Sequence, residues 1–219
     1  MNARERILAK LRAAAPAALP VRPDVVVPQV GPAVDRVGEF ERQLVALHAE
    51  VIVAGEAVWR HRLAEAIMAR RVRRLLADWQ SDAGRALAQA LPSGVDWVAF
   101  ERPIEAWKEE LFTTIDAGFS VADAAVAATG TLIFASGARA PRTVSLVPPL
   151  HCALVHAERI HADLPAALAA GRWSDAMPTN LIMVSGPSKT ADIQQTLAYG
   201  AHGPKELVVV VVLPDGAPR

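Results

Sequence analysis

The sequence predicts an α/β fold with a mainly parallel sheet and helices on both faces. Two features lead to this prediction. From Asp35 onward, amphipathic segments of roughly 10–15 residues alternate with short apolar runs, as they do in βαβ units. Two later runs, 181–184 and 207–213, have the length and β-branched content of buried strands. Right-handed crossovers between parallel strands then put helices on both faces of the sheet.

Composition excludes several classes of function. The chain has 219 residues, of which 52% are hydrophobic, enough for a substantial core. Lysine and arginine total 23, and aspartate and glutamate also total 23, so no overall field favours nucleic acid or an acidic membrane. Aromatic residues make up only 5%, which argues against a platform for stacking bases. We therefore expect no nucleic-acid partner.

Membrane spans and cysteine chemistry are also limited by the sequence. The longest apolar runs hold about seven residues, whereas roughly 20 are needed to cross a bilayer. The first residues are charged where a signal peptide has its apolar region, so we expect a cytoplasmic protein with no membrane span. Cys152 is the only cysteine, which excludes an iron–sulfur cluster or thiolate zinc site built by this chain alone.

The N-terminal stretch has the pattern of an arm. Residues 2–15 have helical spacing, with Asn2 as a candidate cap, and five prolines follow within 16–32. We predict an N-terminal helix and Pro-rich arm over 1–32 and a single α/β domain over 33–219. The arm either packs on its own domain or docks a partner.

The elements of the domain follow in order. Asp35 is placed to cap the first helix, which extends to about Ala49. Small residues around Thr129-Gly130-Thr131 favour either strand, turn and strand or a helix over 121–128. Gly171 is the predicted left-handed cap of the helix before it. The other predicted elements are strands over 51–54, 72–77, 95–100 and 150–155, helices over 57–71, 81–90, 104–111 and 160–170, and a loop-rich stretch over 137–149.

The segment 185–204, S-G-P-S-K-T-A-D-I-Q-Q-T-L-A-Y-G-A-H-G-P, carries the densest chemistry between two strands. It fails the test for a nucleotide-triphosphate loop, because that motif requires Gly-Lys-Ser/Thr. The amides after Gly186, the hydroxyls of Ser188 and Thr190, and the Lys189 ammonium can together bind an anion. The alternative is that Ser188 caps a short helix and Lys189 is solvated.

Two histidines and one carboxylate are the candidate catalytic residues. His202 stands between glycines, where backbone can approach a ligand closely, and histidine transfers protons near neutral pH. His151 lies near the start of a strand, a position that faces a cleft. Asp192 can pair with Lys189 or Arg142 or orient His202, and the alternative is a carboxylate that only holds the loop together. A lone histidine is more often structural, and no metal site is predicted because the sequence does not show that these three groups converge.

A second set of candidates precedes these. The hydroxyls and amides of Thr129, Gly130 and Thr131 suit a carboxylate or phosphate. Arg142 can clamp a planar carboxylate through two hydrogen bonds, and Ser145 follows it in the same stretch. The alternatives are a plain turn at Gly130 and an ordinary loop ion pair at Arg142.

Four motifs occur in one order: T-G-T, R-x-x-S-L-x-P-P-x-H, G-P-S-K-T-A-D-I and G-x-H-G-P. Together they resemble the LUD domain, and within it the lactate utilization protein C (LutC/YkgG) family, over about 117–213. The motif positions are Thr129, Gly130, Thr131, Arg142, Ser145, His151, Gly186, Ser188, Lys189, Thr190, Asp192, His202 and Gly203. Relatives often have Glu before T-G-T, whereas this chain has Ala128, which removes a candidate catalytic carboxylate.

The resemblance implies a fold like that of the NagB/RpiA/CoA-transferase superfamily. It also implies a role in oxidising L-lactate to pyruvate, with iron–sulfur clusters on partner subunits and no cofactor on this chain. Our first hypothesis is a non-redox subunit whose glycine-broken loops form one pocket for a small carboxylate or phosphorylated ligand.

Two other hypotheses stay open. One is a free-standing isomerase or transferase acting on a phosphorylated or CoA-linked substrate, with Asp123 or Asp192 as a candidate base. The other is a structural or regulatory protein that docks through its arm. A homo-oligomer is compatible with each of them.

Overall fold

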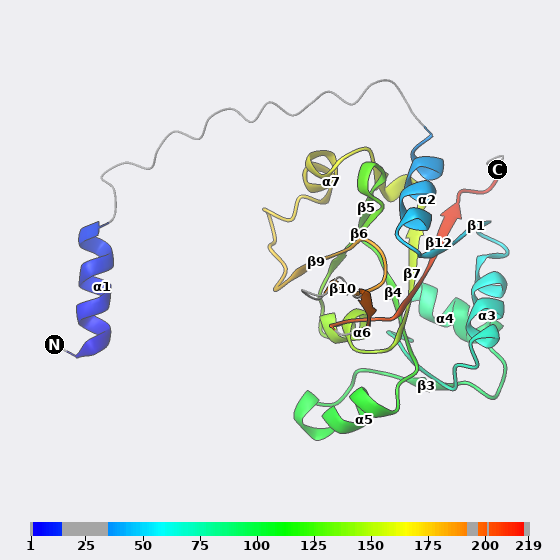
Figure 1. Cartoon of the computed structure of the whole chain (residues 1–219), viewed down its shortest axis with the longest axis horizontal. Coiled ribbons are helices and arrows are strands. Elements are labelled where there is room, and N and C mark those ends of the chain that lie inside the picture. Colours follow the sequence, from blue (N-terminus) through cyan, green and yellow to red (C-terminus); the bar gives the residue numbers. More distant parts are fainter. Residues whose placement is uncertain (1, 15–34, 192–196, 201, 217–219) are drawn as a thin grey trace.

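A computed structural model describes residues 2–14, 35–191, 197–200 and 202–216 (Figure 1). At its centre is a six-stranded sheet in which all neighbouring strands are parallel. In order across the sheet, the strands are β1 (Glu50–Gly55), β12 (Glu206–Leu213), β7 (Leu150–His156), β4 (Ala117–Val121), β2 (Arg74–Leu76) and β3 (Asp96–Val98). The predicted α/β class and its parallel sheet are confirmed.

One face of this sheet is covered by helices, and the other face by a helix together with a second sheet. The helices involved are α3 (Trp59–Ala69), α4 (Asp82–Ala90) and α2 (Arg36–Ala46). α3 and α4 lie on one face, where Leu63 and Leu87 share a core with Val208 and Val210 of β12. On the other face, Val209 packs with residues of α2 and of a second sheet. Side chains alternate along a strand, so the valines of β12 fill both cores.

The second sheet has four strands and lies against the face that α2 covers. In order they are β8 (Ile160–His161), β5 (Ala124–Val126), β6 (Thr131–Ala135) and β9 (Leu181–Val184). β6 runs antiparallel to both β5 and β9, whereas β5 and β8 are parallel. Leu132 and Phe134 of β6 share a core with Ala153 of the central sheet. Figure 1 shows this smaller sheet on the opposite side of the central sheet from α3 and α4.

The turn between β5 and β6 decides between the two interpretations of the T-G-T region. A short 3-10 turn, η2 (Ala127–Thr129), ends at Gly130, which has φ of +60°. The predicted alternative of a helix over 121–128 is wrong. A Cβ at Gly130 would lie 2.9 Å from both Gln43 Cβ and Leu44 N, so glycine lets the turn approach α2. The small buried residues here serve close packing between layers.

Several elements differ from prediction. The helix predicted from Asp35 to about Ala49 ends at Ala46, and the helix predicted over 104–111 is a 3-10 turn over 104–106 followed by an α-helix over 108–113. The stretch 137–149, predicted as loop, contains the short helix α6 (Arg142–Leu146). The helix predicted over 160–170 begins later, as α7 (Leu164–Gly171), because 160–161 pair with β5 and the Asp163 side chain caps the helix through Ala166 N at 2.8 Å. Its left-handed cap is Arg172, with φ of +47°, and not Gly171. The remaining elements are η1 (Ile104–Ala106), α5 (Lys108–Thr113), η3 (Ala157–Arg159), β10 (Lys189–Ala191) and β11 (Leu197–Tyr199).

Helix α6 lies directly over β4. A Cβ at Gly118 would lie only 2.0 Å from the Val144 carbonyl oxygen and 3.3 Å from Pro148 Cγ. Gly118 also pairs with His151 in the β4–β7 register. The missing side chain therefore sets how closely α6 approaches β4, at the position paired with His151 of β7.

The N-terminal helix is α1 (Ala3–Ala14), and none of its residues is buried. Asn2 caps it as predicted: Glu5 N donates to Asn2 Oδ1 at 2.9 Å, and Asn2 N donates to Glu5 Oε2 at 2.9 Å. The Pro-rich part of the predicted arm lies outside the described residues. Among the helices that the structure describes, none is long and apolar enough to cross a membrane.

Candidate functional site

A cavity of about 220 Å³ opens where the two sheets meet, at the amino ends of β7 and β12. It is bounded by α6, by β9 and the loop that follows it, and by the segment that enters β12. Six of the predicted site residues line it: Ser145, His151, Gly186, Ser188, His202 and Gly203. The fold therefore brings together residues from three of the four sequence motifs.

Backbone hydrogen bonds hold these segments in place. Ser188 N donates to the Pro204 carbonyl at 2.8 Å, which joins the loop after β9 to the approach to β12. Lys205 N donates to the Pro149 carbonyl at 2.7 Å, which joins that approach to the start of β7. β7 and β12 then run in register, with His151 opposite Leu207. The cavity walls are thus fixed by main-chain contacts between distant segments.

His151 forms the inner wall and is only 1% exposed. Neither of its ring nitrogens has a hydrogen-bond partner among the described residues. Burial lowers the pKa of His151 from 6.5 to about 3, so the ring is neutral at physiological pH. The Phe134 ring lies beside it, with centroids 5.4 Å apart. A neutral imidazole offers one donor and one acceptor, and each of the two ring nitrogens has less than 1 Å² of accessible surface.

Three hydroxyls lead from the T-G-T motif to the cavity. Thr129 Oγ1 lies 2.6 Å from Thr131 Oγ1, which lies 2.7 Å from Ser185 Oγ. Thr131 is 8% exposed and does not line the cavity, whereas Ser185 does. The sequence singled out both threonines but not Ser185 as a ligand residue. In the sequence, the only indication of Ser185 is its position directly after the strand 181–184. The pairing of β6 with β9 shows that Ser185 contacts Thr131.

Other predicted site residues lie apart from the cavity lining. Arg142 is exposed at the start of α6, and its carbonyl accepts a hydrogen bond from Ser145 Oγ at 3.1 Å. Lys189 is exposed in β10, next to the lining residue Ser188. Gly130 forms the turn described above. Thr190 belongs to β10, with its side chain outside the described part, and Asp192 lies outside the described residues altogether.

Metal ligation has no support within the described chain. No group of three or more His, Cys, Asp or Glu side chains there is arranged to hold a metal ion. His151 and His202 do line one cavity, which the sequence alone left open.

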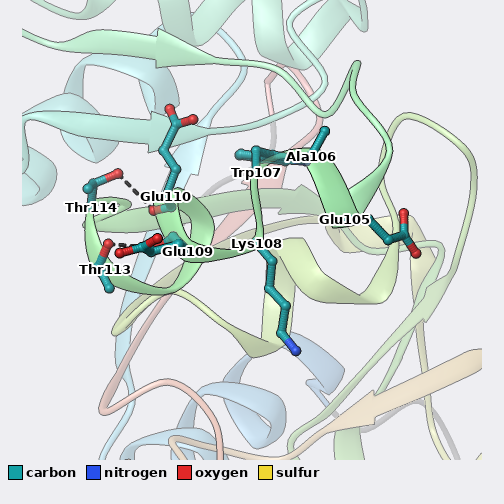
Figure 2. A pocket seen from close by; sticks show the side chains of 8 residues that line it. All are labelled: Glu105, Ala106, Trp107, Lys108, Glu109, Glu110, Thr113 and Thr114. Atoms are coloured by element: carbon teal, nitrogen blue, oxygen red, sulfur yellow. Dashed lines mark hydrogen bonds between the residues drawn. The ribbon is translucent and has the colours of Figure 1, made fainter.

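A larger hollow, about 480 Å³, follows the stretch 105–114 around α5 (Figure 2). All eight lining residues come from this one stretch, and none is a predicted site residue. Two of its polar residues have partners within the chain: Thr114 Oγ1 donates to the Glu110 carbonyl at 2.8 Å, and the Glu110 carboxylate accepts from Arg74 at 2.6 Å and Arg102 at 2.8 Å. These bonds lower the pKa of Glu110. We interpret the hollow as the outer surface of a tethered helix.

The smaller cavity suits a small ligand with few polar groups. Its volume is below the roughly 300 Å³ at which pockets for drug-sized ligands begin. None of the described residues lining it is Lys, Arg, Asp or Glu. The polar groups are three serine hydroxyls and two imidazoles, set among Leu146, Met183 and Leu207.

Comparison with known proteins extends these findings. The chain matches the model of the LUD domain over residues 37–212. It is 40% identical to an uncharacterized protein of Neisseria meningitidis serogroup B over 98% of this chain and 95% of the other. It is also 32% identical over 104 residues to lactate utilization protein C of Halalkalibacterium halodurans, and 32% identical over 121 residues to the protein of that name from an Exiguobacterium strain.

These two matches have limited extent. They cover 44% and 53% of this chain, and 44% and 52% of the relatives, so the chain spans about half the length of each. A crystal structure of a DUF162 family protein from Deinococcus radiodurans has the same fold, with a TM-score of 0.61 and 23% identity over 82% of this chain and 99% of the other. With the predicted motifs, these matches relate the protein to lactate utilization proteins, and the chain belongs to the LUD domain family.

Proposed function

We propose that this protein is a non-redox LUD subunit of a cytoplasmic system that oxidises L-lactate to pyruvate, and that it binds a small anionic ligand in the cavity beside His151. The observation that carries the proposal is a buried imidazole without a described partner, facing a small cavity lined by family motif residues. Buried polar groups in native proteins are nearly always hydrogen-bonded, so a partner from outside the chain is the natural explanation.

The non-redox assignment rests on the cysteine content of the chain. Cys152 is the only cysteine, and it is fully buried in β7. Burial raises the pKa of its thiol to about 12, which keeps it protonated and unreactive. Iron–sulfur clusters need several thiolates, so in this proposal partner subunits carry them and the electrons.

In this proposal, hydrogen-bond donors at the cavity wall hold the carboxylate of the ligand. Ser188 and His202 line the cavity, and glycine at 186 and 203 leaves the backbone accessible beside them. Hydrogen bonds to a charged acceptor are stronger than neutral ones, so several such donors can hold a small carboxylate. A phosphorylated or CoA-linked substrate fits less well, because the cavity is small and no described lysine or arginine lines it.

Growth of a deletion strain tests the proposed pathway. Deleting the gene in its host should abolish growth on L-lactate as sole carbon source and leave growth on pyruvate intact. The wild-type gene should restore growth, His151→Phe should not, and His61→Phe, which changes an exposed histidine of α3, should. The tagged full-length protein should also co-purify with iron–sulfur subunits. Normal growth on L-lactate after deletion, in a strain with no second copy, contradicts the proposal.

A further inference from the structure

Helix α7 is apolar on every side, yet most of it is exposed. Its eight residues are L-P-A-A-L-A-A-G, none of them charged, and Ala167 is the one that is buried. Leu164 and Leu168 lie one turn apart on the same side of the helix and are 37% and 42% exposed. A helix without a polar face is normally buried, because its apolar surface is unfavourable in water. α7 therefore has the composition of a helix that another element covers.

Helix α1 has an apolar side that is also uncovered (Figure 1). Ile7, Leu8 and Leu11 are 59%, 36% and 63% exposed, and their spacing of three and four residues puts them on one side of the helix. An isolated helix of 12 residues is only marginally stable in water, so α1 gains stability by packing this side against another apolar surface. The same chain thus has two uncovered apolar helix surfaces.

The segment that joins α1 to the domain ends beside α7. Arg36, the first residue of α2, donates from Nη1 to the Ile160 carbonyl at 3.4 Å. Ile160 begins β8, and two residues separate the end of β8 from α7. The segment 15–34 has 20 residues, and a chain of 20 residues can span up to roughly 70 Å. α1 is therefore attached close to α7 and has more than enough chain to reach it.

Charge favours α1 over a second copy of the domain as the element that covers α7. A cavity of about 270 Å³ beside Ala170 and Gly171 has as its titratable lining residues Asp123, Glu158, Arg159 and His161. These total −1 with the histidine neutral. α1 has four basic side chains and one acidic one, a net charge of +3. The surface around α7 therefore attracts α1, whereas a second copy would oppose its own negative charge.

The size of the contact points to a tethered helix. Five aliphatic side chains bury on the order of a few hundred Å², whereas stable complexes of separate proteins bury roughly 1,200 Å² or more. A tethered helix forms a smaller contact, because attachment gives it an effective concentration on the order of millimolar.

We infer that α1 packs its Ile7–Leu11 side against the Leu164–Leu168 side of α7 in the same chain. Each helix presents a pair of large apolar side chains four residues apart, the spacing at which the ridges of one helix fit the grooves of another. The exposed alanines of α7 allow a close approach. None of these residues lines the candidate cavity, so the proposed function does not depend on this contact.

Pairs of introduced cysteines test the contact in the full-length protein. The native Cys152 is fully buried, so the introduced thiols are the reactive ones. Leu11→Cys is combined with Leu168→Cys or, as a control, with Met68→Cys on α3, where the 43% exposure of Met68 matches that of Leu168. Under mild oxidation the first pair should form a disulfide within one chain at least about tenfold faster than the control pair. Non-reducing electrophoresis and peptide mass spectrometry measure this.

Hydrogen exchange supplies a second measurement. Amides in the second half of α1 should exchange at least about tenfold more slowly in wild type than in Leu168→Glu, and Met68→Glu should keep the slow exchange. If Leu168→Glu does not fold, Leu11→Glu is compared with Ala9→Glu, which lies on the opposite side of α1. Leu11→Glu should then speed exchange in α7, and Ala9→Glu should not.

Three results overturn the inference. The first is an equal rate of disulfide formation in the two cysteine pairs. The second is exchange in α1 that is equally fast in wild type and in Leu168→Glu. The third is a disulfide that joins two chains in preference to one, which would assign the exposed side of α7 to a second copy.

Discussion

Thr131 Oγ1 and Ser185 Oγ lie 2.7 Å apart, although 54 residues separate them in the chain. Thr131 begins β6, and Ser185 follows β9 in the same antiparallel pair. The hydrogen bond ties the T-G-T turn to the loop that lines the cavity. The hydroxyl of Ser185 is thereby oriented by a residue that does not line the cavity itself.

Replacing Thr131 by valine tests this connection. The substitution keeps the shape and removes the central hydroxyl, so we expect a loss of about 1–2 kcal/mol in the free energy of unfolding and weaker ligand binding. Thr129→Val, at an exposed position, should cost less than about 0.5 kcal/mol. Urea denaturation and calorimetry measure both effects. Equal behaviour of the two variants would show that the link to Ser185 has no role.

Gly118→Ala should displace α6 and so change the shape of the cavity. The new Cβ would overlap the Val144 carbonyl, 2.0 Å away, and push α6 with its lining residues Ser145 and Leu146. Overpacking of this kind costs about 1–3 kcal/mol. The control is Gly94→Ala, where a Cβ meets nothing within 4 Å. Thermal unfolding should separate the two variants, and equal melting temperatures would count against the close approach of α6.

Gly186→Ala should destabilise the protein through an unfavourable backbone conformation and through a steric clash, and a control variant separates these two effects. Gly186 has φ of +99°, and a Cβ there would lie 2.9 Å from Leu47 Cβ and 3.0 Å from Leu47 O. Gly216 also has a positive φ, +79°, but no atom lies within 4 Å of its Cβ position. Gly216→Ala should cost only the conformational penalty, about 1–2 kcal/mol. Gly186→Ala should cost more and should weaken ligand binding, and denaturation with calorimetry decides whether it does.

Stability should depend on pH through His151. Its pKa is about 3 in the folded protein and 6.5 when solvated, so the unfolded chain binds the extra proton between these values. Above pH 6.5 the ring is neutral in both the folded and the unfolded chain, so it costs no stability. As the pH drops toward 3, the free energy of unfolding of the protein falls by up to about 1.4 kcal/mol for each pH unit. Urea unfolding from pH 7.5 to 4.5 should show a steeper decline for wild type than for His151→Gln. Parallel curves would contradict the buried, neutral state of the ring.

Local features were predictable because they depend on near neighbours. The Asp35 side chain caps α2 as predicted, accepting from Gly38 N at 2.9 Å. Alternation of apolar runs and amphipathic segments correctly predicted five of the six strands of the central sheet, whereas β4 was not predicted as a strand. The four ordered motifs pointed to the LUD domain, which the family match confirms. The position of His151 at the start of a strand correctly predicted that it faces a cleft.

Features that depend on distant contacts were not predictable in this way. The helix alternative for 121–128 followed from alanine propensity, but these small residues pack between layers as β5 and η2. Nothing near Gly118 in the chain indicates that Val144 lies against it. Ser185 looked like an ordinary residue after a strand until β6 and β9 were paired.

By itself, the sequence determined the α/β class, the buried valine strand, the helix cap at Asp35 and the family, since each is encoded by periodicity, capping chemistry or motif order within short stretches. Only the tertiary structure decided that the described strands form three sheets, that a cavity lies at the amino ends of β7 and β12, and that His151 is buried there without a described partner. The physical reason is that strand pairing and side-chain burial are set by the packing of segments far apart in the chain, which local propensity does not specify.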